Sequence, residues 1–210
     1  MPDMQCTTID YYFWTSSDWA YFGNPRLKEM AVSFGLTINY YPVDLATVYS
    51  RTGGIKLKDR SVERKNYRLD EMRRYSAMLE MPIVMQPKHP IVSTEMSSRV
   101  IIAAKEQGID VHELTHEIMG RRWVHDEDIE DEWVLKQVLD GLGLDADTLW
   151  KNASQGWAHD RYKQYTEEAI ARGVFGSPFY FYGNERFWGQ DRLDTLRSYV
   201  RRTLVDSTGA

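Results

Sequence analysis

The sequence predicts an α/β protein in which a helical lobe is inserted between the two halves of a small sheet. Three observations predict it: a strand-helix-strand pattern opens the chain, an almost wholly helical stretch fills its middle, and a β-hairpin followed by a helix closes it. At 210 residues the chain is long enough for one sizeable core that carries such a lobe.

The opening unit spans residues 8–43. Residues 8–13 are β-branched and aromatic, which is typical of a buried strand. Residues 15–18, Thr-Ser-Ser-Asp, all favour the N-cap of a helix, and apolar residues then recur at helical spacing as far as Gly35. Residues 36–43 form a second strand, so we expect a parallel pair joined by a right-handed crossover.

Helical patterns fill most of residues 44–173. The candidate helices are 61–80, 94–107, 111–120, 131–142, 145–152 and 159–172. A stretch of this length does not fit inside one small sheet, so we interpret it as an insertion. We therefore assign 1–52 and 168–210 to the sheet-bearing domain and 53–167 to an inserted helical domain.

The closing unit follows Ser177 and Pro178. Residues 179–182 and 185–188 are two short strands joined by a Gly-Asn turn, which predicts a β-hairpin, and a final helix starts near Asp191. The order β-α-β, helical lobe, α-β-β-α is that of a thioredoxin-like fold with a large insertion.

Composition excludes several classes of function. The formal charge of -5 provides no electrostatic reason to expect nucleic acid, and no run of ~18 apolar residues predicts a membrane span. The start lacks a basic segment followed by an apolar run, so we expect no secretion. The single cysteine, Cys6, rules out an internal disulfide and a dithiol redox centre. We therefore expect a cytoplasmic protein.

Aromatic residues are abundant, with seven Trp and thirteen Tyr. Some can line a pocket for a small aromatic or unsaturated substrate, although most will pack the core. We expect Trp14, Trp19 and Trp188 to line a cleft near Ser17. The tryptophans expected in the core from their helical patterns are Trp123, Trp133, Trp150 and Trp157.

Three segments taken together resemble a known family. They are DYYF…SDWAYF…NPRL within residues 10–27, VFGSP at 174–178 and WGQDRL at 188–193. In this order they are similar to the 2-hydroxychromene-2-carboxylate isomerases and the related kappa-class glutathione transferases, over nearly the whole chain. The resemblance implies a DsbA-type fold, a homodimer and glutathione as cofactor.

Ser17 is the residue on which the implied chemistry depends. The resemblance makes it the serine that hydrogen-bonds the glutathione sulfur. In thiol oxidoreductases of this fold the same helix start carries Cys-x-x-Cys, whereas here Ser17 and Ala20 stand there, which excludes disulfide exchange at these positions. A helix N-terminus and a hydroxyl donor together stabilise a thiolate. The alternative is that Ser17 only caps the helix.

The resemblance implies a cofactor site at the other two segments as well. Ser177 and Pro178, with the proline in the cis form, would expose backbone to an extended peptide such as glutathione. Gln190 and Asp191 would receive its γ-glutamyl end. The alternatives are a trans proline at a strand start and an ordinary acidic N-cap.

The family reaction is the cis–trans isomerisation of a ring-opened hydroxybenzylidenepyruvate by reversible addition of a thiolate. The resemblance suggests Lys88, His89 and Arg99, in or after a Pro-rich loop, as ligands of the substrate carboxylate or enolate. Trp19 is the aromatic candidate. The alternative for each cation is a solvated surface position.

Two residues depart from the family pattern. Asp18 stands where members usually have Pro, and a carboxylate beside the sulfur should oppose thiolate formation. Gly54 stands where an Asn often contacts glutathione or substrate. These departures keep two alternatives open: a kappa-like glutathione transferase or peroxidase, and a thioredoxin-fold protein without glutathione chemistry.

A separate motif, His112-Glu113-Leu114-Thr115-His116, matches the H-E-x-x-H pattern of zinc hydrolases. No third ligand is apparent, because His125 lies beyond a predicted helix break. We interpret the match as coincidence and expect no metal site.

Overall fold

The computed structural model describes residues 6–90 and 93–208. The strands are β1 (Thr8–Phe13), β2 (Thr37–Pro42), β3 (Phe179–Tyr182) and β4 (Glu185–Trp188). The α-helices are α1 (Asp18–Phe34), α2 (Leu45–Thr52), α3 (Val62–Leu79), α4 (Glu95–Glu106), α5 (His112–Trp123), α6 (Glu132–Gly141), α7 (Ala146–Ala153), α8 (Gly156–Ala171) and α9 (Leu193–Thr208). Short 3₁₀ turns are η1 (Leu57–Asp59) and η2 (Gln190–Arg192).

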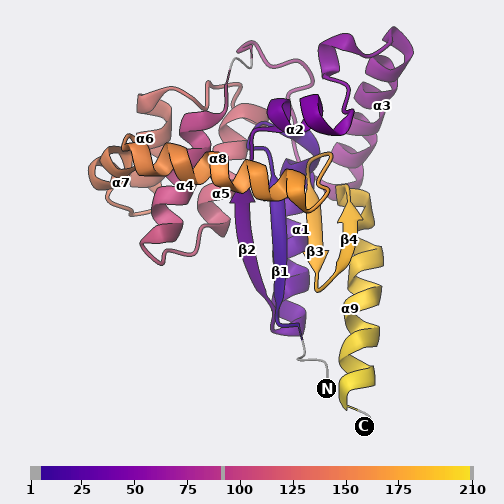
Figure 1. The fold of residues 1–210 in the computed structure, drawn as a ribbon. Coiled ribbons are helices and arrows are strands. Elements are labelled where there is room, and N and C mark those ends of the chain that lie inside the picture. Colours follow the sequence, from indigo (N-terminus) through magenta and orange to yellow (C-terminus); the bar gives the residue numbers. More distant parts are fainter. Residues whose placement is uncertain (1–5, 91–92, 209–210) are drawn as a thin grey trace.

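The four strands form one mixed sheet in the order β2-β1-β3-β4 (Figure 1). β1 is parallel to β2 and antiparallel to β3, and β3 is antiparallel to β4. This topology confirms the predicted thioredoxin-like α/β fold with its parallel pair and hairpin.

Side chains alternate between the two faces of the sheet along each strand, and in β1 and β3 both faces pack into apolar clusters. Tyr11 and Tyr180 lie in the larger apolar core with residues of α1 and α9. Tyr12 and Phe181 point the other way, into a second cluster with residues of α8. The aromatic strands therefore have no solvent-facing side, as in a sheet covered by helices on both faces.

The helices α4 to α7 gather beside β2, and α8 crosses in front of the strands (Figure 1). Their apolar residues join the same core as β1 and α1, among them Ile101, Leu114 and Leu135. The domain boundaries at 52 and 167 remain a prediction. No helix in the described ranges is long and apolar enough to cross a bilayer.

The structure differs from the sequence-based expectations in detail. A further helix, α2, begins at the N-cap Asp44, whose carboxylate accepts from Ala46 N at 2.9 Å. The expected burial of Trp133 and Trp157 was wrong, since they are 64% and 41% exposed. Spacing alone misplaced them, because helices of a multi-helix lobe share apolar faces unevenly and leave some flanking positions in solvent.

One close approach fixes where α1 lies against the chain segment after β4. At Gly23, an added Cβ would come within 2.8 Å of the Tyr180 hydroxyl and 3.0 Å of Gln190 Cβ. Any larger residue at position 23 would therefore displace Tyr180 and Gln190 away from α1.

We predict that Gly23→Ala lowers the free energy of unfolding by about 1–3 kcal/mol through overpacking. Gly120→Ala is the control, because a Cβ at that helical position meets nothing within 4 Å and should raise stability by about 0.5–1 kcal/mol. Urea denaturation measures both, and a Gly23→Ala protein as stable as Gly120→Ala would contradict the prediction.

Candidate active site

Three chain segments meet at one edge of the sheet. β1 ends there at Phe13, and because β3 is antiparallel to β1, β3 begins at the same edge, with Phe179 opposite Tyr12. β4 ends there in turn, with Trp188 opposite Phe179. The loops that carry Ser17, Ser177 and Gln190 therefore leave the sheet side by side.

Ser17 is the N-cap of α1 and is buried, with 4% exposure. Its Oγ accepts from Ala20 N at 3.2 Å and donates to the Ser177 carbonyl over a longer 3.4 Å. The capping alternative is thus a real role of this residue. The hydroxyl proton is only weakly engaged, so Ser17 keeps a donor at the helix N-terminus.

Ser177 and Pro178 lie directly against the first loop. The Ser177 Oγ accepts from Trp14 N at 2.9 Å, and the peptide bond between Ser177 and Pro178 is cis. Ser177 precedes the last ladder pair, Tyr12 with Phe179, so β1 does not use its backbone groups.

Gln190 and Asp191 differ in accessibility. Gln190 is buried, and its Oε1 accepts from Arg26 Nη1 at 2.6 Å, which holds the segment after β4 against α1. Asp191 has a side chain 46% exposed beside Arg192. Gly189 N donates to the Pro178 carbonyl at 2.9 Å, so both residues lie next to the cis proline.

Asp18 follows Ser17, and its carboxylate is buried against the lobe. Its Oδ2 is 2.8 Å from Nη2 of Arg68, on α3, and the two side chains are 9% and 14% exposed. Burial raises the pKa of Asp18, while Arg68 and the N–H of Trp19 oppose that rise. The charge beside Ser17 is therefore balanced by a cation that the sequence analysis did not identify, because residues 18 and 68 lie on different helices.

The three cations expected to bind the substrate make different contacts in the structure. Lys88 is exposed, with Nζ 3.2 Å from Asp126. The backbone carbonyl of His89 accepts from Arg122 Nη1 at 3.1 Å. The Arg99 side chain is mostly buried and binds Glu95 and the Gln155 carbonyl. Its contacts therefore connect helices with one another.

Two of the tryptophans expected to line a cleft near Ser17 lie in different environments. Trp19 is partly buried against Tyr75 of α3, with ring centroids 5.8 Å apart. Trp188 is 53% exposed and contacts Phe175, with centroids 4.9 Å apart. At Gly54 an added Cβ would overlap the ring of Tyr49, so the position that departs from the family has a packing reason to lack a side chain.

The two histidines of the H-E-x-x-H motif have partners of their own. His112 Nδ1 lies 2.8 Å from the Tyr40 hydroxyl, and His116 stacks on Tyr21 with centroids 5.6 Å apart. Within the described residues, no group of three or more His, Cys, Asp or Glu side chains could hold a metal ion.

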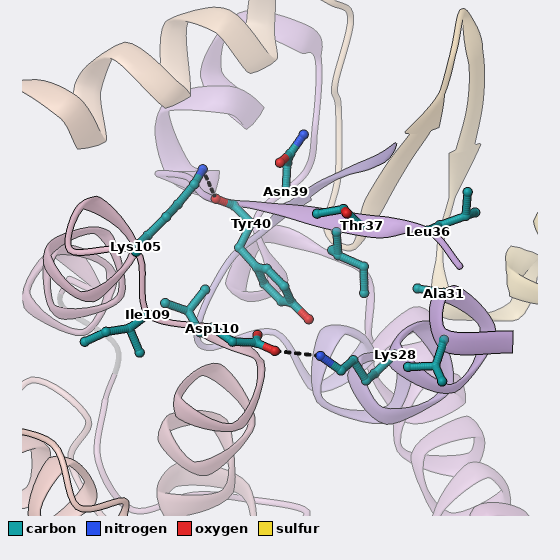
Figure 2. A pocket seen from close by; sticks show the side chains of 13 residues that line it. Lys28, Ala31, Leu36, Thr37, Asn39, Tyr40, Lys105, Ile109 and Asp110 are labelled. Carbon is teal, nitrogen blue, oxygen red and sulfur yellow. Dashed lines mark hydrogen bonds and ion pairs between the residues drawn. The ribbon is translucent and has the colours of Figure 1, made fainter. Parts of the chain in front are cut away.

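Two cavities differ in their relation to this edge. The larger, about 460 Å³, lies along β2 between the second half of α1 and the loop before α5. Figure 2 shows Lys28 paired with Asp110 across it and Lys105 bound to the Tyr40 carbonyl. It begins roughly 16 Å along α1 from Ser17 at 1.5 Å per residue. The smaller, about 120 Å³, is lined by Ser16, the residue before Ser17, and by Arg122.

Fold and site together define a thioredoxin-fold protein with a serine at the N-cap of the helix that follows β1. A family model described as DSBA-like thioredoxin domain matches residues 8–201. The chain belongs to the DSBA-like thioredoxin domain family.

Its relatives within that family agree with one another. The chain is 30% identical over 195 residues to a 2-hydroxychromene-2-carboxylate isomerase of Sphingobium xenophagum, covering 92% of this chain and 97% of the relative. A Pseudomonas sp. (strain C18) protein of the same name is also 30% identical, covering 91% and 89%. A solved 2-hydroxychromene-2-carboxylate isomerase structure superimposes with a TM-score of 0.84 at 28% identity, covering 96% and 98%. These relatives support an isomerase activity.

We predict that Arg68→Met lowers the free energy of unfolding by about 3–5 kcal/mol, because it leaves the Asp18 carboxylate buried without a cation. Adding Asp18→Asn should recover much of that loss. Arg73→Met is the control on the same helix, since its pair with Asp70 is exposed and contributes less than about 1 kcal/mol. Equal urea midpoints for Arg68→Met and Arg73→Met would refute the prediction.

The buried histidines predict a pH effect on stability. Burial lowers the pKa of His112 and of His116 below the ordinary 6.5. Near and below pH 6.5 the unfolded chain therefore binds more protons than the folded one, so their contribution is complete above 6.5 and is lost on acidification.

His116→Phe keeps a ring on Tyr21 and removes one titrating group. Between about pH 7.5 and 5.5 we expect its free energy of unfolding to fall less steeply, by up to ~1.4 kcal/mol per pH unit. Urea denaturation at several pH values measures the slope. His125→Asn, at an exposed histidine, is the control, and identical slopes in wild type and His116→Phe would count against the prediction.

Proposed function

We propose that this protein is a glutathione-dependent cis–trans isomerase that acts on a ring-opened aromatic compound with a conjugated double bond and a carboxylate. One observation carries the proposal: the Ser17 hydroxyl stands at the start of α1, opposite the Ser177 carbonyl, in a chain whose relatives at 30% identity are 2-hydroxychromene-2-carboxylate isomerases. Ala20 occupies the place of a second thiol, so dithiol exchange is excluded at this helix start.

The residues at the sheet edge fit a small peptide thiol. The weak 3.4 Å contact of Ser17 with Ser177 leaves the hydroxyl able to turn toward a sulfur. Ser177 lies beyond the β1–β3 ladder, and its backbone, which Ser17 contacts only weakly, can pair with an extended peptide. The half-exposed Asp191 carboxylate suits the ammonium of a γ-glutamyl group.

When bound, glutathione would supply a thiolate that adds reversibly to the conjugated double bond, so that rotation takes place about a single bond. The chain's own part is electrostatic. Ser17 donates to the sulfur and favours its ionised form, and the dipole of α1 adds to this effect. Arg68 keeps the Asp18 carboxylate from opposing that ionisation. Gln190, held by Arg26, keeps the loop after β4 in register with Ser177.

We predict that Ser17→Ala lowers kcat/KM for glutathione-dependent isomerisation about a hundredfold, because one donor to the developing anion is lost. The same change should raise the pKa of the bound thiol, measured by thiolate absorbance against pH. Ser17→Gly retains most of the capping stability and should lose as much activity. Asp145→Ala, which removes a remote helix cap, should keep full activity. Full activity in Ser17→Ala would overturn Ser17 as the thiolate partner.

Product analysis tests the reaction class. The wild-type protein is incubated with glutathione and 2-hydroxybenzylidenepyruvate, and both isomers and the glutathione are quantified. An isomerase returns all of the glutathione, whereas a transferase consumes it. Glutathione at millimolar concentration should also raise the melting temperature, and an unchanged melting temperature would contradict glutathione binding.

A further inference from the structure

The smaller cavity lies on the lobe side of the Ser16–Ser17 pair. It measures about 120 Å³, and its walls include Ser16, Pro90, Arg122, Asp128 and Glu130. Pockets that enclose whole ligands measure roughly 300–1,000 Å³, so this one has room only for one end of a molecule. Ser17 contacts Ser177, and the preceding residue, Ser16, lines this cavity, so one short loop takes part in both.

Two polar atoms of residues that line the cavity are buried without a hydrogen-bond partner. Ser16 is 2% exposed and Arg122 is 6% exposed. Within the described part of the chain, neither Ser16 Oγ nor Arg122 Nε makes a hydrogen bond. Buried polar atoms are nearly always paired in folded proteins, so two orphan donors on one cavity indicate a ligand that accepts hydrogen bonds.

Arg122 is held in position by its other contacts. Its Nη1 donates to the His89 carbonyl at 3.1 Å, and its guanidinium lies 5.3 Å from the centroid of the Trp123 ring. Arg68, which pairs with Asp18 at the start of α1, lies over the same ring at 6.0 Å. A guanidinium fixed in this way has little orientation left to lose when an anion binds.

The two acids of the cavity accept hydrogen bonds from neighbouring groups, and the charge of Asp128 also acts on Arg122. Glu130 accepts from Met96 N, Ser97 N and the Ser97 hydroxyl at 2.9–3.0 Å, which places its charge at the start of α4. The Asp128 Oδ1 accepts from Glu130 N at 3.0 Å. These carboxylate oxygens accept from backbone N–H groups and the Ser97 hydroxyl, whereas Ser16 Oγ and Arg122 Nε have no hydrogen-bond partner in the described residues. The free hydrogen-bonding capacity of the cavity is therefore that of a donor site.

We propose that Ser16 and Arg122 form the subsite that binds the carboxylate end of the substrate, and so select carboxylate-bearing substrates. This inference rests on the proposed isomerase function and names the part of the site that recognises the substrate. The sequence suggested Lys88, His89 and Arg99 as ligands of the carboxylate. In the structure, Arg122 lines a cavity next to the loop of residues 14–17, which is called the serine loop here.

The test compares two probes, 2-hydroxybenzylidenepyruvate and its methyl ester, which share the conjugated system and differ in charge. For Arg122→Gln we expect kcat/KM for the free acid to fall about a hundredfold, and for the ester to stay within about threefold. Ser16→Ala should lose about tenfold on the acid alone. Arg121→Gln, on the same helix but paired with Glu127, is the matched control and should keep its activity on both probes.

Calorimetric binding of the free acid without glutathione separates this inference from the proposed function. Absence of glutathione-dependent isomerisation in the wild type overturns the function. Unchanged acid binding in Arg122→Gln, or an equal loss on acid and ester, overturns the carboxylate subsite. Should Arg122→Gln fold poorly by thermal melting, Ser16→Ala and Arg122→Lys decide by the same acid-to-ester ratio.

Discussion

The antiparallel pairing of β3 with β1 is the constraint on which the rest of the site depends. Strands that run in opposite directions begin and end at opposite edges, so β1 ends where β3 begins and β4 ends. The start of α1 thereby meets two segments that follow it by 160 positions or more, and Ser17 comes within hydrogen-bond distance of Ser177. A one-residue slip of β3 would turn Tyr180 and Phe181 to the wrong faces of the sheet, so the packing of both cores enforces the geometry of the site.

The helical lobe provides the cations at the end of the sheet where Ser17 lies. Arg68 comes from α3 and balances Asp18, while Arg122 comes from α5 and lines the cavity beside Ser16. The serine loop is also tied to the lobe, since Thr15 Oγ1 lies 2.9 Å from Ser97 Oγ, which donates to Glu130. Helices that lie between β2 and β3 in the chain thus supply the charges, and the sheet supplies the backbone and the helix start.

The strands, most of the helices and Ser17 as a helix cap could be predicted because they depend on local signals. Cap residues, strand composition and the Gly-Asn turn act over a few positions, and each is visible in the sequence. Trp133 and Trp157 could not be placed correctly, because helical spacing says which residues share a face but not which face meets another helix. The stacking of His116 on Tyr21 could not be predicted for the same reason.

The order of elements, the helix start at Ser17 and the absence of a thiol at residues 17 and 20 follow from the sequence alone. The match of the Asp18 charge by Arg68 and the cavity shared by Ser16 and Arg122 arise from the packing of α3 and α5. Local patterns arise from interactions between near neighbours in the chain, whereas an ion pair or a cavity depends on which helices pack together. The carboxylate that looked like an obstacle to thiolate formation is therefore one half of a buried pair.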